Sequence, residues 1–134
     1  MGTTTRRFAR TAVALGLSAA FVATATPAEA KGLEIRRSGT CSGSATWTLK
    51  AKADNGRIEV ELEVDSNVSG QAWAVALRDQ GVLVHSGVSR TVAPSGSFEV
   101  RRIILNRVGT DTISAVANHP ATGQRCAGSL SFPG

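Results

Sequence analysis

The sequence of 134 residues has few of the residue types that usually carry chemistry. It contains two histidines, two cysteines, one methionine and no tyrosine. It has no nucleophile elbow, phosphate-binding loop, zinc-spaced cysteine set or H-E-x-x-H motif. We therefore assign no catalytic, metal-binding or cofactor-binding residue, and we expect a protein that needs no cofactor and is not an enzyme.

Long apolar runs are missing after residue 30, and the one apolar run before it is short for a membrane span. Three arginines precede that run, and Ala28 and Ala30 follow it at the small-residue positions of a cleavage site. This arrangement predicts a secretory signal peptide over 1–30, cleaved between Ala30 and Lys31. The remaining 31–134 has the length of one domain. We expect that domain to be released from the cell without a membrane anchor.

The predicted export determines how the two cysteines are interpreted. The pair Arg6-Arg7 could belong to a twin-arginine signal, but Phe8 follows it directly, so we favour the ordinary secretion route. Either route leads to an oxidising compartment, where Cys41 and Cys126 are expected to form a disulfide. The alternative, a free reactive thiol, would need a neighbouring base, and no histidine is near either cysteine in the sequence.

The predicted mature domain has a smaller net positive charge than the whole chain. Removal of three arginines and Glu29 with the signal peptide lowers the formal charge from +5 to +3. The pairs Arg36-Arg37 and Arg101-Arg102 lie in predicted strands, where neighbours point to opposite faces. We interpret them as solvated rims and edges and expect no nucleic-acid partner.

The segment "ATWTLKAKADNGRIEVELEV", 45–64, predicts a β-hairpin. Asn55-Gly56 favours a two-residue turn because both positions tolerate a positive φ. Pairing the strands outward from this turn gives one apolar face and one charged face. The apolar pairs are Ala53–Ile58, Ala51–Val60, Leu49–Leu62 and Trp47–Val64, and the polar pairs are Lys52–Glu59, Lys50–Glu61 and Thr48–Glu63. A shift of one residue would place Lys and Glu in the core, so this register is favoured.

Six further segments have strand-like patterns, and no segment has a sustained helical period. They cover 33–37, 71–78, 82–88, 97–105, 111–118 and 124–132. In 71–78, Trp73, Val75 and Leu77 share one face and alanines occupy the other. Two registers fit the turn Asp79-Gln80-Gly81. The pattern predicts an all-β domain, an antiparallel sandwich of seven or eight strands, with a closed barrel as the alternative.

These features resemble small secreted bacterial domains of immunoglobulin-like or fibronectin-III-like architecture. The tail "GTDTISAVANHPATGQRCAGSLSF" is similar to that of small exported proteins of GC-rich Gram-positive bacteria, most of which have no assigned activity. The chain departs from antibody domains because Cys41 precedes the first long strand, Cys126 lies on the last, and a tyrosine corner is impossible. The resemblance implies no catalytic residues, and the cysteine positions predict a bridge that clamps the terminal strands.

Two acidic segments could hold a ligand, and each also has a structural interpretation. Glu59, Glu61 and Glu63 form a carboxylate stripe with roughly 6.5–7 Å between neighbours, a spacing that suits glycoside hydrolysis. Lysines face two of the three, so we interpret the stripe as a solvated charged face. The segment "DSNVSG", 65–70, matches the start of a calcium loop, but the twelfth position is Ala76 and flanking helices are absent. We interpret it as a connecting turn.

The histidines and tryptophans are interpreted structurally as well. His85 and His119 are expected to be ordinary loop or surface histidines, with His119 in a loop before Pro120. Trp47 and Trp73 lie on the large-residue faces of their strands, so we expect both in the core, although exposed rings could bind a sugar or an apolar ligand.

Three functions remain open from the sequence. The first is a secreted, non-enzymatic binding module whose partner is a protein, the cell envelope or a small molecule. Its binding residues would lie in the end loops "DSNVSG", "TVAPSGS", "NRVGTD" and "HPATG". The second is a protease inhibitor or small hydrolase, with "VAPSG" or "NHPATG" as the inhibitory loop. The third is a carrier of a small apolar ligand, by analogy with secreted sandwich proteins that hold a chromophore.

Overall fold

The structure is a computed structural model that describes residues 2, 14, 16, 18–20 and 32–134. The predicted cleavage point between Ala30 and Lys31, and most of the predicted signal peptide 1–30, lie outside the described residues. Within the described part of the chain, no helix is long and apolar enough to cross a membrane.

Eight β-strands make up the domain. They are β1 (Glu34–Thr40), β2 (Thr46–Asp54), β3 (Arg57–Asp65), β4 (Ala72–Asp79), β5 (Val82–Arg90), β6 (Ser97–Leu105), β7 (Asp111–His119) and β8 (Gln124–Phe132). The predicted ranges 97–105 and 124–132 are confirmed without change, and the others differ by one to three residues at an end.

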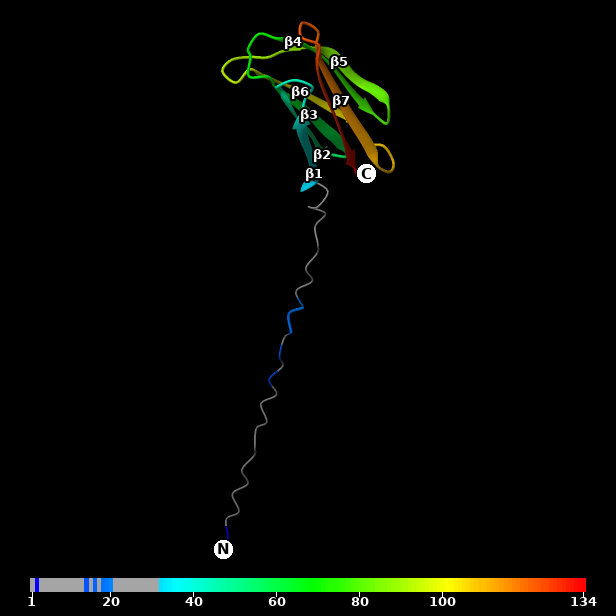
Figure 1. The fold of residues 1–134 in the computed structure, drawn as a ribbon. Coiled ribbons are helices and arrows are strands. Elements are labelled where there is room, and N and C mark those ends of the chain that lie inside the picture. Colours follow the sequence, from blue (N-terminus) through cyan, green and yellow to red (C-terminus); the bar gives the residue numbers. More distant parts are fainter. Residues whose placement is uncertain (1, 3–13, 15, 17, 21–31) are drawn as a thin grey trace.

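The strands form two antiparallel sheets, drawn as two layers in Figure 1. The first sheet has the order β1-β2-β3-β6, and the second has the order β5-β4-β7-β8. The predicted sandwich is therefore confirmed, and the alternative of a closed barrel is wrong because the two sheets do not join into one. Edge strands β1 and β8 lie against each other on one side of the sandwich, and β5 and β6 do so on the other.

The β2–β3 hairpin has the predicted register along its whole length. Asp54 pairs with Arg57 around the turn, and Trp47 pairs with Val64 at the far end. Asn55 and Gly56 both have positive φ angles, 48° and 79°, as a two-residue turn of this kind requires. Pattern and turn chemistry therefore act together to fix this register.

The β4–β5 connection resolves the ambiguity in register. Gln80 and Gly81 form a two-residue turn with φ angles of 51° and 79°, and Arg78 pairs with Leu83. The register then shifts, so that Leu77 pairs with His85 and Val84 is the additional residue. Val84 packs against the core, which gives the irregularity a physical reason.

The core lies between the sheets and comes from the alternate residues of each strand. Leu49, Leu62, Trp73, Leu77 and Phe132 are among its largest side chains. The inward placement of Trp73, Val75 and Leu77, predicted from alternation, is confirmed. Each fully buried apolar side chain of this size contributes roughly 1.5–3 kcal/mol relative to its exposed state.

The predicted disulfide is present between Cys41 and Cys126. Cys41 follows the edge strand β1 of the first sheet, and Cys126 lies in the edge strand β8 of the second. The loop after β1 is also hydrogen-bonded to β8, through Ser42 N to Arg125 O at 2.8 Å and Ala45 N to Gln124 Oε1 at 2.7 Å. The bridge thus ties the two sheets together along one side.

Candidate functional site

The outward faces of the two sheets carry different charges. Residues 32–134 contain nine carboxylate side chains, and alternation places seven of them on the outward face of the first sheet: Glu34, Asp54, Glu59, Glu61, Glu63, Asp65 and Glu99. The other two, Asp79 and Asp111, are buried. No side-chain carboxylate of these residues therefore projects from the outward face of the second sheet.

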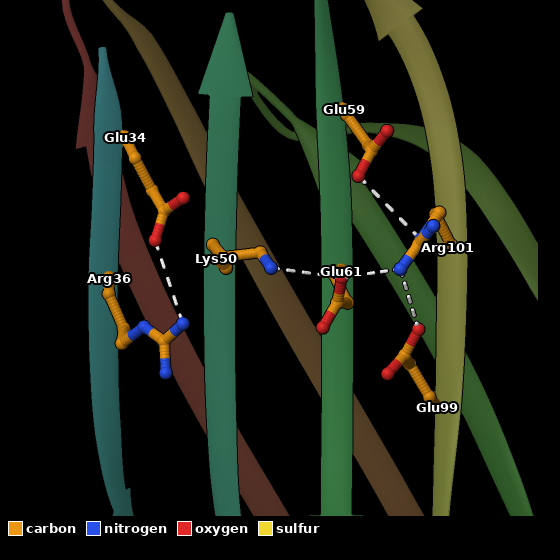
Figure 2. A network of polar contacts seen from close by, with 7 residues as sticks. All are labelled: Glu34, Arg36, Lys50, Glu59, Glu61, Glu99 and Arg101. Carbon is orange, nitrogen blue, oxygen red and sulfur yellow. Dashed lines mark hydrogen bonds and ion pairs between the residues drawn. The ribbon is translucent and has the colours of Figure 1, made fainter. Parts of the chain in front are cut away.

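Four of the seven first-sheet carboxylates, Glu34, Glu59, Glu61 and Glu99, form ion pairs with cations (Figure 2). Glu61 lies between Lys50 and Arg101, each at 3.1 Å, and Arg101 also contacts Glu59 at 3.6 Å and Glu99 at 3.1 Å. Partial burial acts to raise the pKa of Glu61, but hydrogen bonds and charges from Lys50 and Arg101 outweigh it, so this pKa lies below its usual 4.5. The stripe is a charged face on the outside of the sheet, as predicted, and the expected Lys50–Glu61 pair is present. Arg101 rather than Lys52 contacts Glu59, and Glu63 forms no salt bridge with the described residues.

The outward face of the second sheet, called the second-sheet face below, is built from short side chains and arginines. Alternation and register place alanines, serines and valines at its centre: Ala72, Ala74, Ala76, Ser86, Val88, Ser114, Val116, Ala127 and Ser129. Among residues 32–134, the charged side chains on this face are Arg78, Arg90 and Arg125. Residues of this face line two pockets.

A pocket of about 450 Å³, called the loop-end pocket below, lies where β4 begins and β5 ends. Ala72 and Ala74 project outward from β4, opposite Arg90 and Val88 of β5 respectively. Their short side chains leave room that larger residues would fill. Val88 is 72% exposed, so it offers the pocket an uncovered apolar wall.

Two loops complete the loop-end pocket. Residues 69–71 of the β3–β4 loop form one side, and Pro120 and Ala121 of the β7–β8 turn form another. The first loop is fixed to the end of β5 by Gly70 N to Thr91 O at 2.7 Å and Thr91 N to Gln71 O at 3.0 Å. Two of the predicted binding loops, "DSNVSG" and "HPATG", thus contribute residues to one pocket.

His119 lines the pocket from the end of β7, and the loop placement predicted for it is wrong. It is only 6% exposed, because strand alternation continues to the last residue of β7 and turns its ring inward. The ring stacks on Trp73 with centroids 5.2 Å apart, and Nδ1 lies 2.8 Å from Thr122 Oγ1. Trp73, fully buried as predicted, donates from Nε1 to Gln71 Oε1 at 3.2 Å.

Arg90 is the charged side chain of the loop-end pocket. Its guanidinium donates to the Gly70 carbonyl oxygen at 3.3 Å and forms no salt bridge with the described residues. A guanidinium has five N–H donors, so most of them are available to a ligand. The pocket therefore combines an apolar lining with one available cation, an arrangement typical of small-molecule sites.

Trp47 lines a second groove, of about 530 Å³, between β1 and the second-sheet face. Its placement in the core is only partly confirmed, because the ring packs against the core yet stays partly exposed at the β1–β8 side. The indole lies over Gly39 and Gly128, and a β-carbon at position 128 would overlap it. Two glycines thus accommodate a side chain too large for this edge.

A buried carboxylate pair lies at the end of the sandwich opposite the loop-end pocket, and sequence reasoning missed it. Asp79 ends β4 and Asp111 begins β7, and they are 1% and 0% exposed. Arg107 donates from Nε to Asp79 Oδ2 at 3.2 Å, and Asn106, with its amide oriented to donate, bonds Asp111 Oδ2 at 3.0 Å. The sequence signal for this pair is an aspartate at an inward-facing position of each of the two strands.

The remaining predicted candidates have structural roles in the described part of the chain. His85 lies on β5, where its Nδ1 accepts from Arg102 Nε at 3.1 Å, and burial together with the Arg102 charge lowers its pKa. In "DSNVSG", Asp65 Oδ1 accepts from Asn67 N at 2.9 Å, and the segment forms the predicted connecting turn. No group of three or more His, Cys, Asp or Glu among the described residues could hold a metal ion.

Comparison of the chain with protein-family models, with curated proteins and with solved structures finds no match.

Proposed function

We propose that this chain is an exported, non-enzymatic binding module that holds a small apolar ligand in the loop-end pocket. The observation that carries the proposal is the pocket itself: about 450 Å³, lined mostly by alanine, valine, proline and glycine. Small-molecule sites in proteins have volumes of roughly 300–1,000 Å³ and a mostly apolar lining with few polar groups. The two loops that enclose it lie at one end of the sandwich, where binding residues are common.

Export is supported by the signal-peptide pattern of 1–30 and is compatible with the disulfide. The secreted species should begin at Lys31. N-terminal sequencing of protein from culture medium checks this, and a retained precursor or a different first residue would contradict it.

Binding can be tested with N-phenyl-1-naphthylamine, a neutral dye that fluoresces in apolar surroundings. Trp73 gives a second signal, because it stacks on His119, which lines the pocket. A Trp47→Phe background leaves Trp73 as the one tryptophan of the chain. We expect saturable dye fluorescence together with a change in Trp73 emission.

The matched variants are Ala74→Phe and Ser131→Phe, both at outward, exposed positions of the second sheet. Phenylalanine at position 74 fills the pocket and should weaken binding by about tenfold or more, which corresponds to about 1.4 kcal/mol. Ser131 lies at the far end of the sheet, paired with Thr112 near the start of β7, so its variant should bind as the unmodified protein does. Equal binding by the two variants would show that the dye is held elsewhere.

A further inference from the structure

We infer that the ligand of the loop-end pocket is a small amphiphilic carboxylate, with its apolar body in the pocket and its carboxylate held by Arg90. This inference rests on the proposed function and names its ligand class. It starts from the distribution of charge. The side-chain carboxylates of residues 32–134 lie on the first sheet or are buried, whereas the charged side chains of these residues on the second-sheet face are all arginines.

The first step concerns the state of the Arg90 charge. On the first sheet, Arg101 contacts three glutamates and Arg36 contacts Glu34. Arg90 has only the Gly70 carbonyl oxygen at 3.3 Å and forms no salt bridge with the described residues. Guanidinium stays protonated in proteins, so Arg90 presents an uncompensated positive charge beside an apolar cavity.

The second step concerns the kind of anion. Arg90 is the one cationic side chain that lines the pocket among the described residues. Arg78 lies four residues beyond Ala74 on β4, about 13 Å along the strand at 3.3 Å per residue. A single cation matches a single negative charge, and the planar guanidinium fits the two oxygens of a carboxylate in a bidentate arrangement. The surrounding Ala72, Ala74, Val88 and Pro120 favour an aromatic or aliphatic body next to that carboxylate.

The third step concerns selectivity. A neutral molecule of the same shape would fill the apolar part of the pocket but would form no ion pair with Arg90. An amphiphile whose head group is a cation would meet only positive charge on the second-sheet face, because no side-chain carboxylate of residues 32–134 lies there. The pocket should therefore rank ligands of equal shape in the order anion, neutral molecule, cation.

The test compares 2-naphthoate with 2-naphthamide, which share one ring system and differ in charge. Binding of each to the mature chain is measured by isothermal titration calorimetry. We expect naphthoate to bind about fivefold or more tightly than naphthamide, as one partly exposed ion pair of about 1 kcal/mol allows. The preference should shrink when salt is raised from about 0.02 M to about 0.5 M, because the pair is reached by solvent.

The matched variants are Arg90→Gln and Arg78→Gln, which remove the same charge from the same face at different distances from the pocket. Arg90→Gln should bind both probes equally, and Arg78→Gln should keep the preference. Arg90→Lys retains the positive charge but lacks the paired N–H donors of the guanidinium, so it should keep part of the preference for naphthoate. This variant also tests the inference if Arg90→Gln fails to fold.

The outcomes separate the inference from the proposed function. Equal binding of both probes by the unmodified protein, or a preference that survives Arg90→Gln, overturns the carboxylate inference and leaves the pocket function intact. Failure of the unmodified protein to bind either probe, together with failure to bind the neutral dye, overturns both.

Discussion

At the scale of single residues, the two buried aspartates are the least expected feature. Asp79 Oδ1 has no hydrogen-bond partner among the described residues, although its side chain is almost fully buried and lies against Asp111. A buried polar atom without a partner costs about 1–3 kcal/mol. A proton held by Asp79 and shared with Asp111 would give this buried pair a hydrogen bond, in line with the raised pKa of Asp79.

This arrangement predicts that stability falls as pH rises. Burial, followed by the hydrogen bond and charge of Asp111, raises the pKa of Asp79 above its usual 3.8, against the opposing effect of Arg107. The folded chain therefore binds this proton more tightly than the unfolded chain does. The stabilisation is fully present below pH 3.8 and is lost as pH rises through the raised pKa.

The measurement is the free energy of unfolding in urea, from about pH 4 to about pH 8, for the unmodified protein and for Asp79→Asn. Asparagine can donate to Asp111 at any pH, so the variant should lose the downward slope. The difference between the two curves is the quantity to examine, because the lowered pKa of Glu61 adds stability with the opposite pH dependence. A difference that does not change with pH would contradict the shared proton.

Gly128 gives a second prediction at this scale. Since a β-carbon there would overlap the Trp47 indole, Gly128→Ala should destabilise the fold by about 1–3 kcal/mol. Combining it with Trp47→Leu should recover much of that loss, because the overlap is removed. A double-mutant cycle measured by chemical denaturation gives the coupling, and simple additivity of the two changes would show that they do not interact.

At the scale of elements, the β2–β3 hairpin tests strand alternation directly. Leu62 is 2% exposed and faces Leu49 inside the sandwich, whereas Glu61 lies on the charged face beside Lys50. Leu62→Ala should cost about 2–5 kcal/mol as a buried truncation. Glu61→Ala should cost about 1 kcal/mol or less as part of a surface ion pair. Denaturation midpoints, compared between proteins with the same denaturant dependence, measure both losses in unfolding free energy. A larger loss for Glu61→Ala would reverse the assignment of the two faces.

Individual strands and this hairpin could be predicted because their determinants are local. The strand-like pattern of 97–105, and Asn55-Gly56 between two alternating strands, can be recognised without knowledge of the rest of the chain. The β4–β5 register could not be chosen, because its shift at Val84 depends on how that side chain packs against the distant core. The loop predicted for His119 is wrong because that prediction depends on the proline that follows, whereas strand β7 extends up to that proline.

At the scale of the whole molecule, the assignment of strands to sheets and the sites depend on contacts distant in sequence. The loop-end pocket joins residues near 70, 90 and 120, and the carboxylate pair joins positions 79 and 111. Sequence reasoning proposed the loops "DSNVSG" and "HPATG" separately, but nothing local shows that β4 and β7 are neighbours. Only that neighbourhood brings the two loops to one pocket, and it places Asp79 beside Asp111 at the other end.

The disulfide is the covalent constraint at this largest scale. Cys41 and Cys126 are 85 residues apart, so their bond closes most of the domain into one loop. On the opposite side, β5 and β6 are joined by non-covalent contacts such as Arg102 Nε to His85 Nδ1 at 3.1 Å. In the chain-entropy description, closing a loop of this length stabilises the fold by about 4–5 kcal/mol, through restriction of the unfolded chain.

We therefore expect the double variant Cys41→Ala/Cys126→Ala to lose about 4–5 kcal/mol of unfolding free energy. Its dependence on denaturant should also become steeper, because an unfolded chain without the cross-link exposes more surface. Urea denaturation measures both quantities, and the unmodified protein under reducing conditions should match the variant. Thiol labelling of the unreduced, fully denatured protein is the control for the bond itself. Two reactive thiols per chain would contradict the bridge, and an unchanged denaturant slope would show that it acts on the folded state instead, where it ties β8 to the end of β1.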